Sequence, residues 1–130
     1  MKINHISIAT PEFEKTLEIF KNLLGIKPEI INFEERKLKI GIFHIGNLML
    51  EIISPMEGEE TVSKFIEKRG GGIHHIAFEV ENAEEKFKEL ESKGFKIVQG
   101  IRKGVKSKKV FFLDPKTTGK VLIEIVEKEY

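Results

Sequence analysis

The sequence contains no cysteine. This absence excludes disulfide bonds, thiolate metal ligands and a cysteine nucleophile, and it fits a reducing compartment. Long apolar runs are absent as well, since no stretch approaches the roughly 20 residues that a membrane-spanning helix needs. The first residues, MKINHISIA, lack the long apolar segment of a signal peptide. We therefore expect a cytoplasmic protein that does not insert into a membrane.

An excess of charge of either sign is also lacking, because 22 basic residues face 21 acidic ones and leave a net charge of +1. No overall field attracts nucleic acid or an anionic membrane, so neither is expected as a partner. Hydrophobic residues make up 40% of the chain and charged residues 33%, which is typical of a globular protein. A length of 130 residues suits one domain.

The two halves of the chain repeat one pattern. The segment HISIA, which starts at His5, resembles HIAFE, which starts at His75. Each is strand-like and is followed by an amphipathic helical pattern that stops at a glycine, Gly25 in the first half and Gly94 in the second. Short strand-like runs follow in each half, over residues 29–33, 38–45 and 48–53 and then 96–101, 110–113 and 121–126.

The order strand–helix–strand–strand–strand, βαβββ, therefore occurs twice, with a joint near residues 67–72, where Arg-Gly-Gly-Gly interrupts the pattern. We predict a single α+β domain over residues 1–130, with module one over about 1–68 and module two over about 69–130. The two modules are expected to share one curved mixed sheet. A duplication of ferredoxin-like units is the alternative, but the observed order favours the shared sheet.

Side-chain alternation along the predicted strands singles out four ionisable residues. Successive side chains of a strand point to opposite faces, so each strand offers one apolar face suited to pack beneath the helices. In the strands at residues 5–9, 48–53, 75–80 and 121–126, the other face carries an ionisable residue among mainly neutral neighbours. A carboxylate in such surroundings is costly to bury unless it is paired or bound to a metal. The four residues are His5, Glu51, His75 and Glu124.

Each module places a histidine on its first strand and a glutamate on its last, 46 positions apart in the first module (51 − 5) and 49 in the second (124 − 75). If a pseudo-twofold axis relates the modules, the two pairs converge on one point. Two imidazoles and two carboxylates suit one divalent ion, Co²⁺, Mn²⁺, Ni²⁺ or Zn²⁺.

A lone histidine or glutamate on a strand is more often a structural or surface residue, and only the recurrence of the pair favours a metal site. His44 has no counterpart in the other module, and His74 lies on the opposite parity to His75. Both are therefore expected in structural or surface roles.

At these residues the sequence resembles the vicinal oxygen chelate superfamily, which includes the glyoxalase I and methylmalonyl-CoA epimerase families. The resemblance covers essentially the whole chain. The stretch LEIISPMEGEETVSKFIEKRGGGIHHIAFEV is similar to the epimerases in particular, while NHISIATP and FLDPKTTGKVLIEI match the superfamily more broadly. The resemblance implies a pair of βαβββ modules around a metal-binding cleft and assigns its ligands to His5, Glu51, His75 and Glu124. A homodimer is implied as well.

The reaction that the resemblance implies is the interconversion of (2R)- and (2S)-methylmalonyl-CoA by abstraction of the C2 proton, through a metal-stabilised enolate. Epimerisation needs a proton donor or acceptor on both faces of the planar intermediate, and Glu51 and Glu124 are the candidates for this catalytic role. The implied partner is an acyl-CoA substrate.

Two other functions remain open. A glyoxalase I-type lactoylglutathione lyase would use the same ligands, and a bleomycin-resistance-like protein would bind a small molecule without catalysis. Binders of this kind generally lack the four ligands, and extradiol dioxygenases of the superfamily use only three in a longer chain.

The segment from Arg102 to Lys109 has five basic residues and no acidic one. It could bind the phosphates of a CoA nucleotide, although a solvent-exposed lysine-rich hairpin loop is the more common form of such a run. Epimerases often have a histidine at the position of Asp114 and a His-Gly-containing loop at 106–109. These departures leave the four predicted ligands intact and bear on the acyl-CoA specificity.

Overall fold

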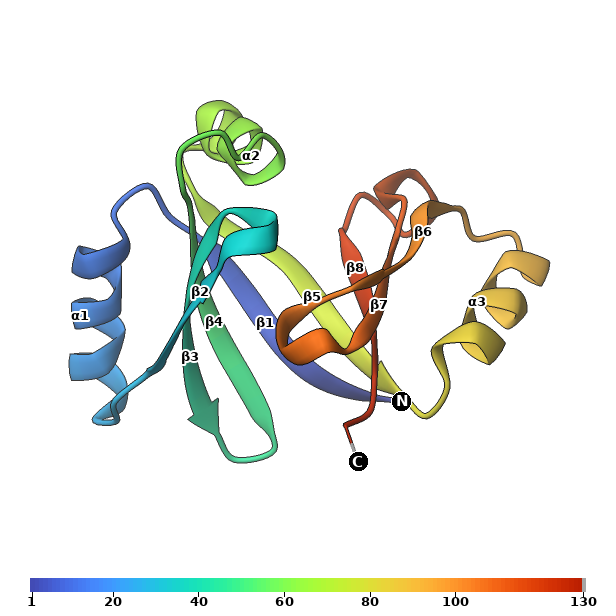
Figure 1. The fold of residues 1–130 in the computed structure, drawn as a ribbon, viewed down its shortest axis with the longest axis horizontal. Coiled ribbons are helices and arrows are strands. Elements are labelled where there is room, and N and C mark those ends of the chain that lie inside the picture. Colours follow the sequence, from blue (N-terminus) through green and yellow to red (C-terminus); the bar gives the residue numbers. More distant parts are fainter. Residues whose placement is uncertain (130) are drawn as a thin grey trace. The chain divides into compact units, whose positions relative to one another are not determined.

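The computed structural model describes residues 1–129 (Figure 1). The described residues fold into eight strands, three α-helices and three short 3₁₀ turns. The strands are β1 (Lys2–Ala9), β2 (Glu29–Phe33), β3 (Leu38–Ile45), β4 (Leu48–Pro55), β5 (Gly72–Val80), β6 (Ile97–Lys103), β7 (Lys109–Leu113) and β8 (Ile123–Glu127). The helices are α1 (Phe13–Leu24), α2 (Thr61–Arg69) and α3 (Ala83–Ser92), and the 3₁₀ turns cover Glu34–Arg36, Val105–Ser107 and Pro115–Thr117.

The strands form one sheet in the order β2-β3-β4-β1-β5-β8-β7-β6. The sheet is mixed, because β5 and β8 run parallel while β2–β3, β3–β4, β6–β7 and β7–β8 are antiparallel pairs. Together with three helices, this topology confirms the predicted α+β class.

The chain divides into two compact units, and the division falls inside strands β1 and β5. One unit consists of residues 6–74, which we call the 6–74 unit. The other combines residues 1–5 with the chain from His75 onward, and we call it the C-terminal unit. The predicted module boundary near residue 68 follows the internal repeat, whereas this division follows the contacts, so the two modules stay a prediction.

The core of the 6–74 unit lies between α1 and the strands β3 and β4, on which α1 packs (Figure 1). Its buried residues are Phe13, Leu17, Phe43 and Ile52, with Ile8 and Leu50 packed against them. Gly41 allows this close packing, because a Cβ at this position would lie 2.3 Å from the Leu17 Cδ2 atom. The helix ends at Gly25, whose φ of 68° is the left-handed conformation expected of a C-terminal cap.

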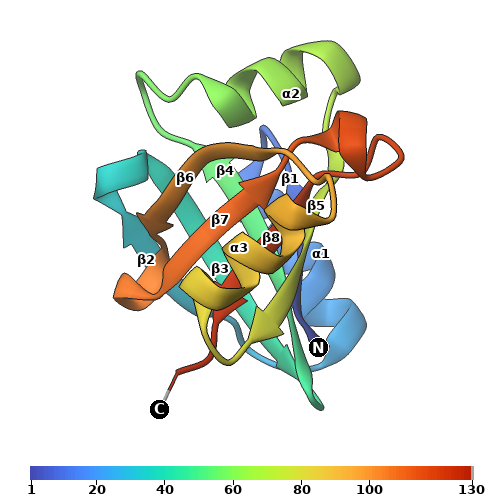
Figure 2. The ribbon, with the colours of Figure 1, turned by 90° about the vertical axis from the view of Figure 1, so that its right-hand side faces the viewer.

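The core of the C-terminal unit lies between α3 and the strands β6, β7 and β8, and Figure 2 shows α3 lying across these strands. Its buried residues are Val80, Ala83, Leu90, Phe111, Leu113 and Ile125, with Phe78 and Ile123 packed against them. The apolar faces predicted from strand parity, such as Ile123 with Ile125, therefore do face the helices.

Sequence patterns placed most elements to within a few residues, and α2 is the exception. No helix was predicted over Thr61–Arg69, and the proposed joint at 67–72 overlaps the last turn of this helix. The apolar residues Val62, Phe65 and Ile66 do have helical spacing, but they cover little more than one turn and only Val62 is buried, so the pattern is too short to identify a helix by itself. The described residues contain no helix both long and apolar enough to span a membrane.

Candidate metal centre

Three of the four predicted ligands lie on neighbouring strands of the C-terminal unit. His5 is on β1, His75 is on β5 and Glu124 is on β8. Glu124 pairs with Ala77 in the parallel ladder, and Ala77 lies two residues after His75 on the same face of β5. The register therefore places His75 and Glu124 on a common face, opposite to the face that packs on α3.

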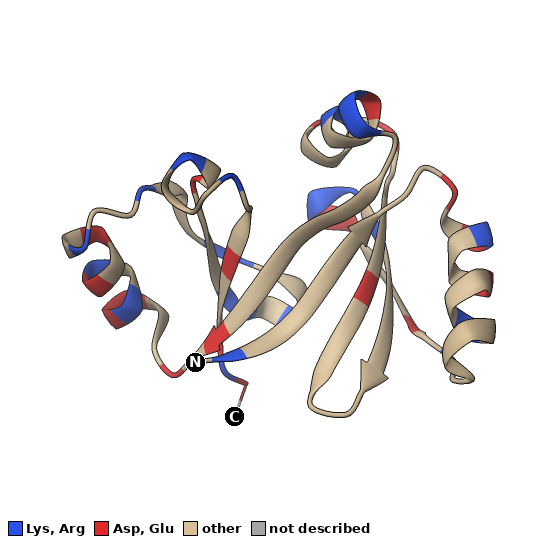
Figure 3. Ribbon diagram, turned by 180° about the vertical axis from the view of Figure 1, so that it is seen from behind, with Lys and Arg blue, Asp and Glu red and all other residues tan. Residues whose placement is uncertain are grey.

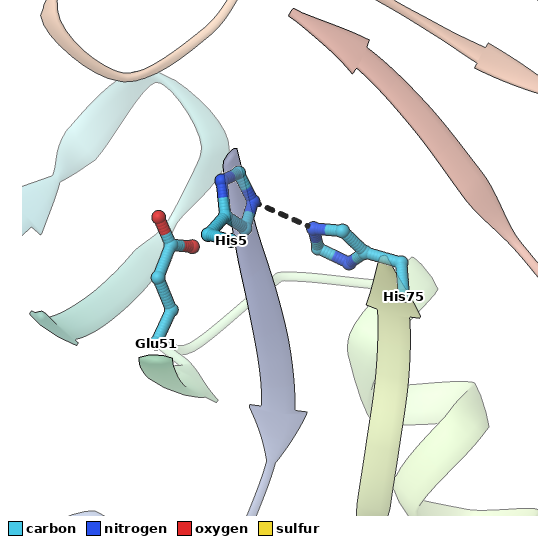
Figure 4. Close-up of side chains that lie close together, drawn as sticks. All are labelled: His5, Glu51 and His75. Carbon is cyan, nitrogen blue, oxygen red and sulfur yellow. Dashed lines mark hydrogen bonds between the residues drawn. The ribbon is translucent and has the colours of Figure 1, made fainter. Parts of the chain in front are cut away.

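The ligand atoms of these three residues converge. His5 Nε2 lies 3.0 Å from Glu124 Oε1 and 3.3 Å from His75 Nε2, which is itself 3.3 Å from Glu124 Oε1. Figure 4 shows the imidazoles of His5 and His75 pointing toward one another, with the dashed line joining their Nε2 atoms. All three side chains are buried, with residue exposures of 6–8%.

The spacing of these atoms fits a shared metal ion. Two ligands that are each about 2.0–2.1 Å from a tetrahedral zinc ion lie about 3.3 Å apart, and the three measured separations are 3.0, 3.3 and 3.3 Å. Glu124 Oε1 is buried, and the Nε2 atoms of both imidazoles lie within 3.3 Å of it. Three ligand atoms so close around one buried point fit the coordination of a shared cation.

The electrostatics of Glu124 agree with a ligand role. Burial raises the pKa of its carboxyl, but the imidazoles of His5 and His75 lower it by more, so that the pKa lies well below the usual range for glutamate. Glu124 is therefore ionised at neutral pH, as a metal-binding carboxylate must be.

Glu51, the fourth predicted ligand, lies on β4 in the 6–74 unit. It is buried, and its Oε1 accepts a hydrogen bond of 3.3 Å from the Ser7 hydroxyl. Figure 3 shows β4 without charge apart from one acidic band, and Glu51 is the only charged residue in the strand LMLEIISP. A buried carboxylate in an apolar strand is the feature by which the sequence singled it out.

The other two histidines have the roles expected of them. His44 is exposed, and its Nε2 lies 3.3 Å from the Glu29 carboxylate. The ring of His74 packs edge-on against Phe65, with ring centroids 4.9 Å apart.

The basic segment from Arg102 to Lys109 is partly paired. Lys109 lies 2.8 Å from Glu84, Lys108 lies 3.5 Å from Glu129, and Arg102 donates to Gln99. These contacts favour the lysine-rich hairpin over a dedicated phosphate site. Asp114 caps a 3₁₀ turn by accepting from the backbone N–H of Lys116, so it has a structural use where epimerases often have histidine.

Sequence reasoning missed two residues beside the ligands. Asn4 lies 2.7 Å from the Nδ1 atom of His5 and donates to Glu79 on β5. Asn4 has the opposite strand parity to His5. Glu79 shares the parity of His75 but is one acidic residue among many, so nothing in the sequence indicates that the two are paired.

Comparison with known protein families gives a match over residues 4–112 to the family described as the Glyoxalase/Bleomycin resistance protein/Dioxygenase superfamily. Among characterised relatives, the human mitochondrial methylmalonyl-CoA epimerase is 32% identical over 127 residues, which span 95% of this chain and 72% of the human one. An ethylmalonyl-CoA/methylmalonyl-CoA epimerase of Cereibacter sphaeroides is 30% identical, with 95% of this chain and 96% of that protein covered.

Solved structures show the same fold. A Streptomyces coelicolor methylmalonyl-CoA epimerase in complex with 2-nitronate-propionyl-CoA superimposes with a TM-score of 0.92 at 26% identity, covering 100% of this chain and 99% of the other. The resemblance in fold therefore extends over the full length of both proteins.

Proposed function

Because the chain belongs to the Glyoxalase/Bleomycin resistance protein/Dioxygenase superfamily, we propose that it is a metal-dependent methylmalonyl-CoA epimerase, which interconverts the (2R) and (2S) forms of methylmalonyl-CoA. The observation that carries the proposal is the convergence of the ligand atoms of His5, His75 and Glu124 in a chain that matches epimerases over nearly its whole length. The similarity to epimerases already favours an isomerase among the activities of this superfamily.

We propose that one divalent ion is held by His5, Glu51, His75 and Glu124. Glu51 is included because it accepts from Ser7, which lies two residues after His5 on the same face of β1. Figure 4 draws His5, Glu51 and His75, each of which offers one ligand atom to the shared ion under this proposal. Two nitrogen and two oxygen ligands fit Co²⁺, Mn²⁺, Ni²⁺ or Zn²⁺.

When bound, a divalent ion supplies a Lewis acid that stabilises negative charge developing on the oxygens of a thioester and a carboxylate. The protein contributes the proton transfer. Inversion at C2 requires that one group removes the proton from one face and that another group returns a proton to the opposite face. Glu51 and Glu124 come from β4 and β8, and we propose that they perform these two transfers.

The lowered pKa of Glu124 bears on this role. Glu124 is ionised and able to accept a proton, but its lowered pKa makes it a weak base while both imidazoles are in contact. Glu51 is buried and accepts a hydrogen bond from the Ser7 hydroxyl. The exchange rates of the two variants described below identify the stronger base.

The acyl-CoA substrate, the homodimeric state and the cytoplasmic location are further parts of the proposal. The substrate follows from the relatives, since solved epimerases carry methylmalonyl-CoA or 2-nitronate-propionyl-CoA. The location rests on the absence of cysteine, although the human relative is mitochondrial.

The test follows the C2 proton. Metal-loaded protein is incubated with (2R)-methylmalonyl-CoA in D₂O, and deuterium at C2 is followed by mass spectrometry. We expect rapid deuteration by the wild type, and a loss of roughly 10² to 10⁴-fold on Glu51→Gln and on Glu124→Gln. Glu57→Gln, which changes an exposed glutamate outside β4, is the matched control and should retain the wild-type rate.

Undiminished exchange in both active-site variants would refute the assignment of the acid and the base. If the wild type instead leaves methylmalonyl-CoA unchanged and converts the hemithioacetal of glutathione and methylglyoxal, the glyoxalase I-type lyase is the correct function. Binding of small molecules without turnover of either substrate would identify a bleomycin-resistance-like binder.

A further inference from the structure

A chain of polar contacts leads from the surface of the C-terminal unit to His5. Asn4 Oδ1 lies 2.7 Å from His5 Nδ1, and the Asn4 amide group donates through Nδ2 to Glu79 Oε1 at 3.2 Å. Asn4 is 8% exposed, and the side chain of Glu79 is 16% exposed. Lys2 lies 3.6 Å from the other Glu79 oxygen and balances its charge.

The chemistry of these groups fixes the direction of every hydrogen bond in the chain. The Glu79 carboxylate can only accept, so the NH₂ group of Asn4 must face it. The carbonyl oxygen of Asn4 then faces His5, and because it too can only accept, His5 Nδ1 must carry a proton. In the neutral His5 that ligates a metal, the lone pair therefore belongs to Nε2, which lies near His75 and Glu124. Without a metal, Nε2 can also carry a proton directed at the Glu124 carboxylate.

We propose that Asn4 and Glu79 are positioning residues that select the tautomer of His5 able to bind a metal through Nε2. The carboxylate of Glu79 orients the Asn4 amide, and the amide in turn orients the imidazole and holds its proton on Nδ1. A ligating histidine usually donates its second N–H to such a partner, and loss of the partner weakens metal binding. The inference deepens the proposed function, since its consequence for metal affinity rests on the metal site proposed above.

The tautomer can be read without metal or substrate. In ¹⁵N-labelled, metal-free protein at neutral pH, long-range ¹H–¹⁵N correlations identify which ring nitrogen of His5 carries the proton. We expect a protonated Nδ1 in the wild type. Asn4→Ala should shift the signals toward a His5 with its proton on Nε2 alone, and Glu79→Gln, whose new amide can donate or accept, should leave Nδ1 only partly protonated.

Metal affinity provides the second readout, with Zn²⁺ measured by competition against a chelator. Asn4→Ala should weaken binding by about 10 to 100-fold, and Glu79→Gln should have a smaller effect. Asn32→Ala, which removes an exposed asparagine of β2, is the matched control and should leave both readouts unchanged.

A paired substitution tests the direction of the hydrogen bonds themselves. In the double variant Asn4→Asp with Glu79→Gln, a carboxylate accepts from His5 Nδ1 and an amide donates to that carboxylate, so the same proton position is enforced. Its Zn²⁺ affinity should return to within about threefold of the wild type, whereas Asn4→Asp alone places two carboxylates side by side and should not recover it. A purely structural contribution of Asn4 would not be rescued in this way.

The inference would be overturned if His5 Nδ1 carries no proton in the wild type, or if the His5 signals do not change in either single variant. Should Asn4→Ala fail to fold, Glu79→Gln and the double variant still decide the question. Failure of the wild type to bind any metal would refute the proposed metal site, while the tautomer measurement would still decide the role of Asn4 and Glu79.

Discussion

At the scale of single residues, the balance of forces on Glu124 explains why this carboxylate can remain charged inside the protein. Burial alone would favour its neutral form, but contacts with His5 and His75 favour the ionised form more strongly. A metal ion in this place would continue the same stabilisation with a larger charge. Removing one imidazole would therefore leave a buried charge with only one of its two partners, which is a costly state.

The lowered pKa of Glu124 leads to a prediction about acid. The carboxyl stays ionised as the pH falls past the ordinary range of glutamate, so it does not limit metal binding there. Imidazoles must be unprotonated to ligate. We expect the affinity for Zn²⁺ to fall with a limiting slope of two protons as the pH drops, because each of the two imidazoles takes up one proton when the metal leaves, measured by chelator competition across pH.

His44→Gln is the control for this titration, because His44 is exposed and its imidazole is no predicted ligand. This variant should show the same two-proton slope as the wild type. A single-proton slope centred near the ordinary pKa of glutamate would mean that a carboxylate, and not the imidazoles, controls release.

At the scale of secondary-structure elements, the N-cap of helix α3 stabilises a helix that packs on β8, on the side opposite the candidate metal centre. Its N-cap is Asn82, whose side chain accepts from the backbone N–H of Glu85. The helix packs on the core that includes Ile125, next to Glu124 in β8. The cap therefore supports the helix that covers the rear face of the ligand-bearing strand.

We predict that Asn82→Ala lowers the free energy of unfolding by about 1 kcal/mol, because a backbone donor of the first turn loses its acceptor. Urea denaturation followed by circular dichroism measures this change. The exposed Asn32→Ala variant, which lacks a capping role, should shift the free energy by less than about 0.5 kcal/mol. Equal effects of the two substitutions would contradict the capping role of Asn82.

The sequence predicted the strands well where apolar residues alternate, as in β3, whose bounds Leu38–Ile45 were predicted without error. Parity also identified which residues share a face with His75 and Glu124. The helix α2 was missed, because its apolar residues Val62, Phe65 and Ile66 have helical spacing over little more than one turn. The hydrogen bond from Asn4 to Glu79 joins positions 75 residues apart, so it follows from the pairing of strands and not from any local pattern.

At the scale of the whole molecule, the family match gives the superfamily of the chain, and a solved epimerase structure shares its fold over nearly the full length of both proteins. In the proposed metal site, each predicted module contributes one histidine and one glutamate. The proposed function requires that these four residues bind a common ion.

The most direct test is X-ray absorption spectroscopy of the protein loaded with Co²⁺. We expect one ion per chain, with scattering from two imidazole rings and from oxygen ligands. In His75→Ala we expect the scattering of one imidazole ring to disappear. A spectrum without imidazole scattering, or one that His75→Ala leaves unchanged, would contradict the proposed metal site.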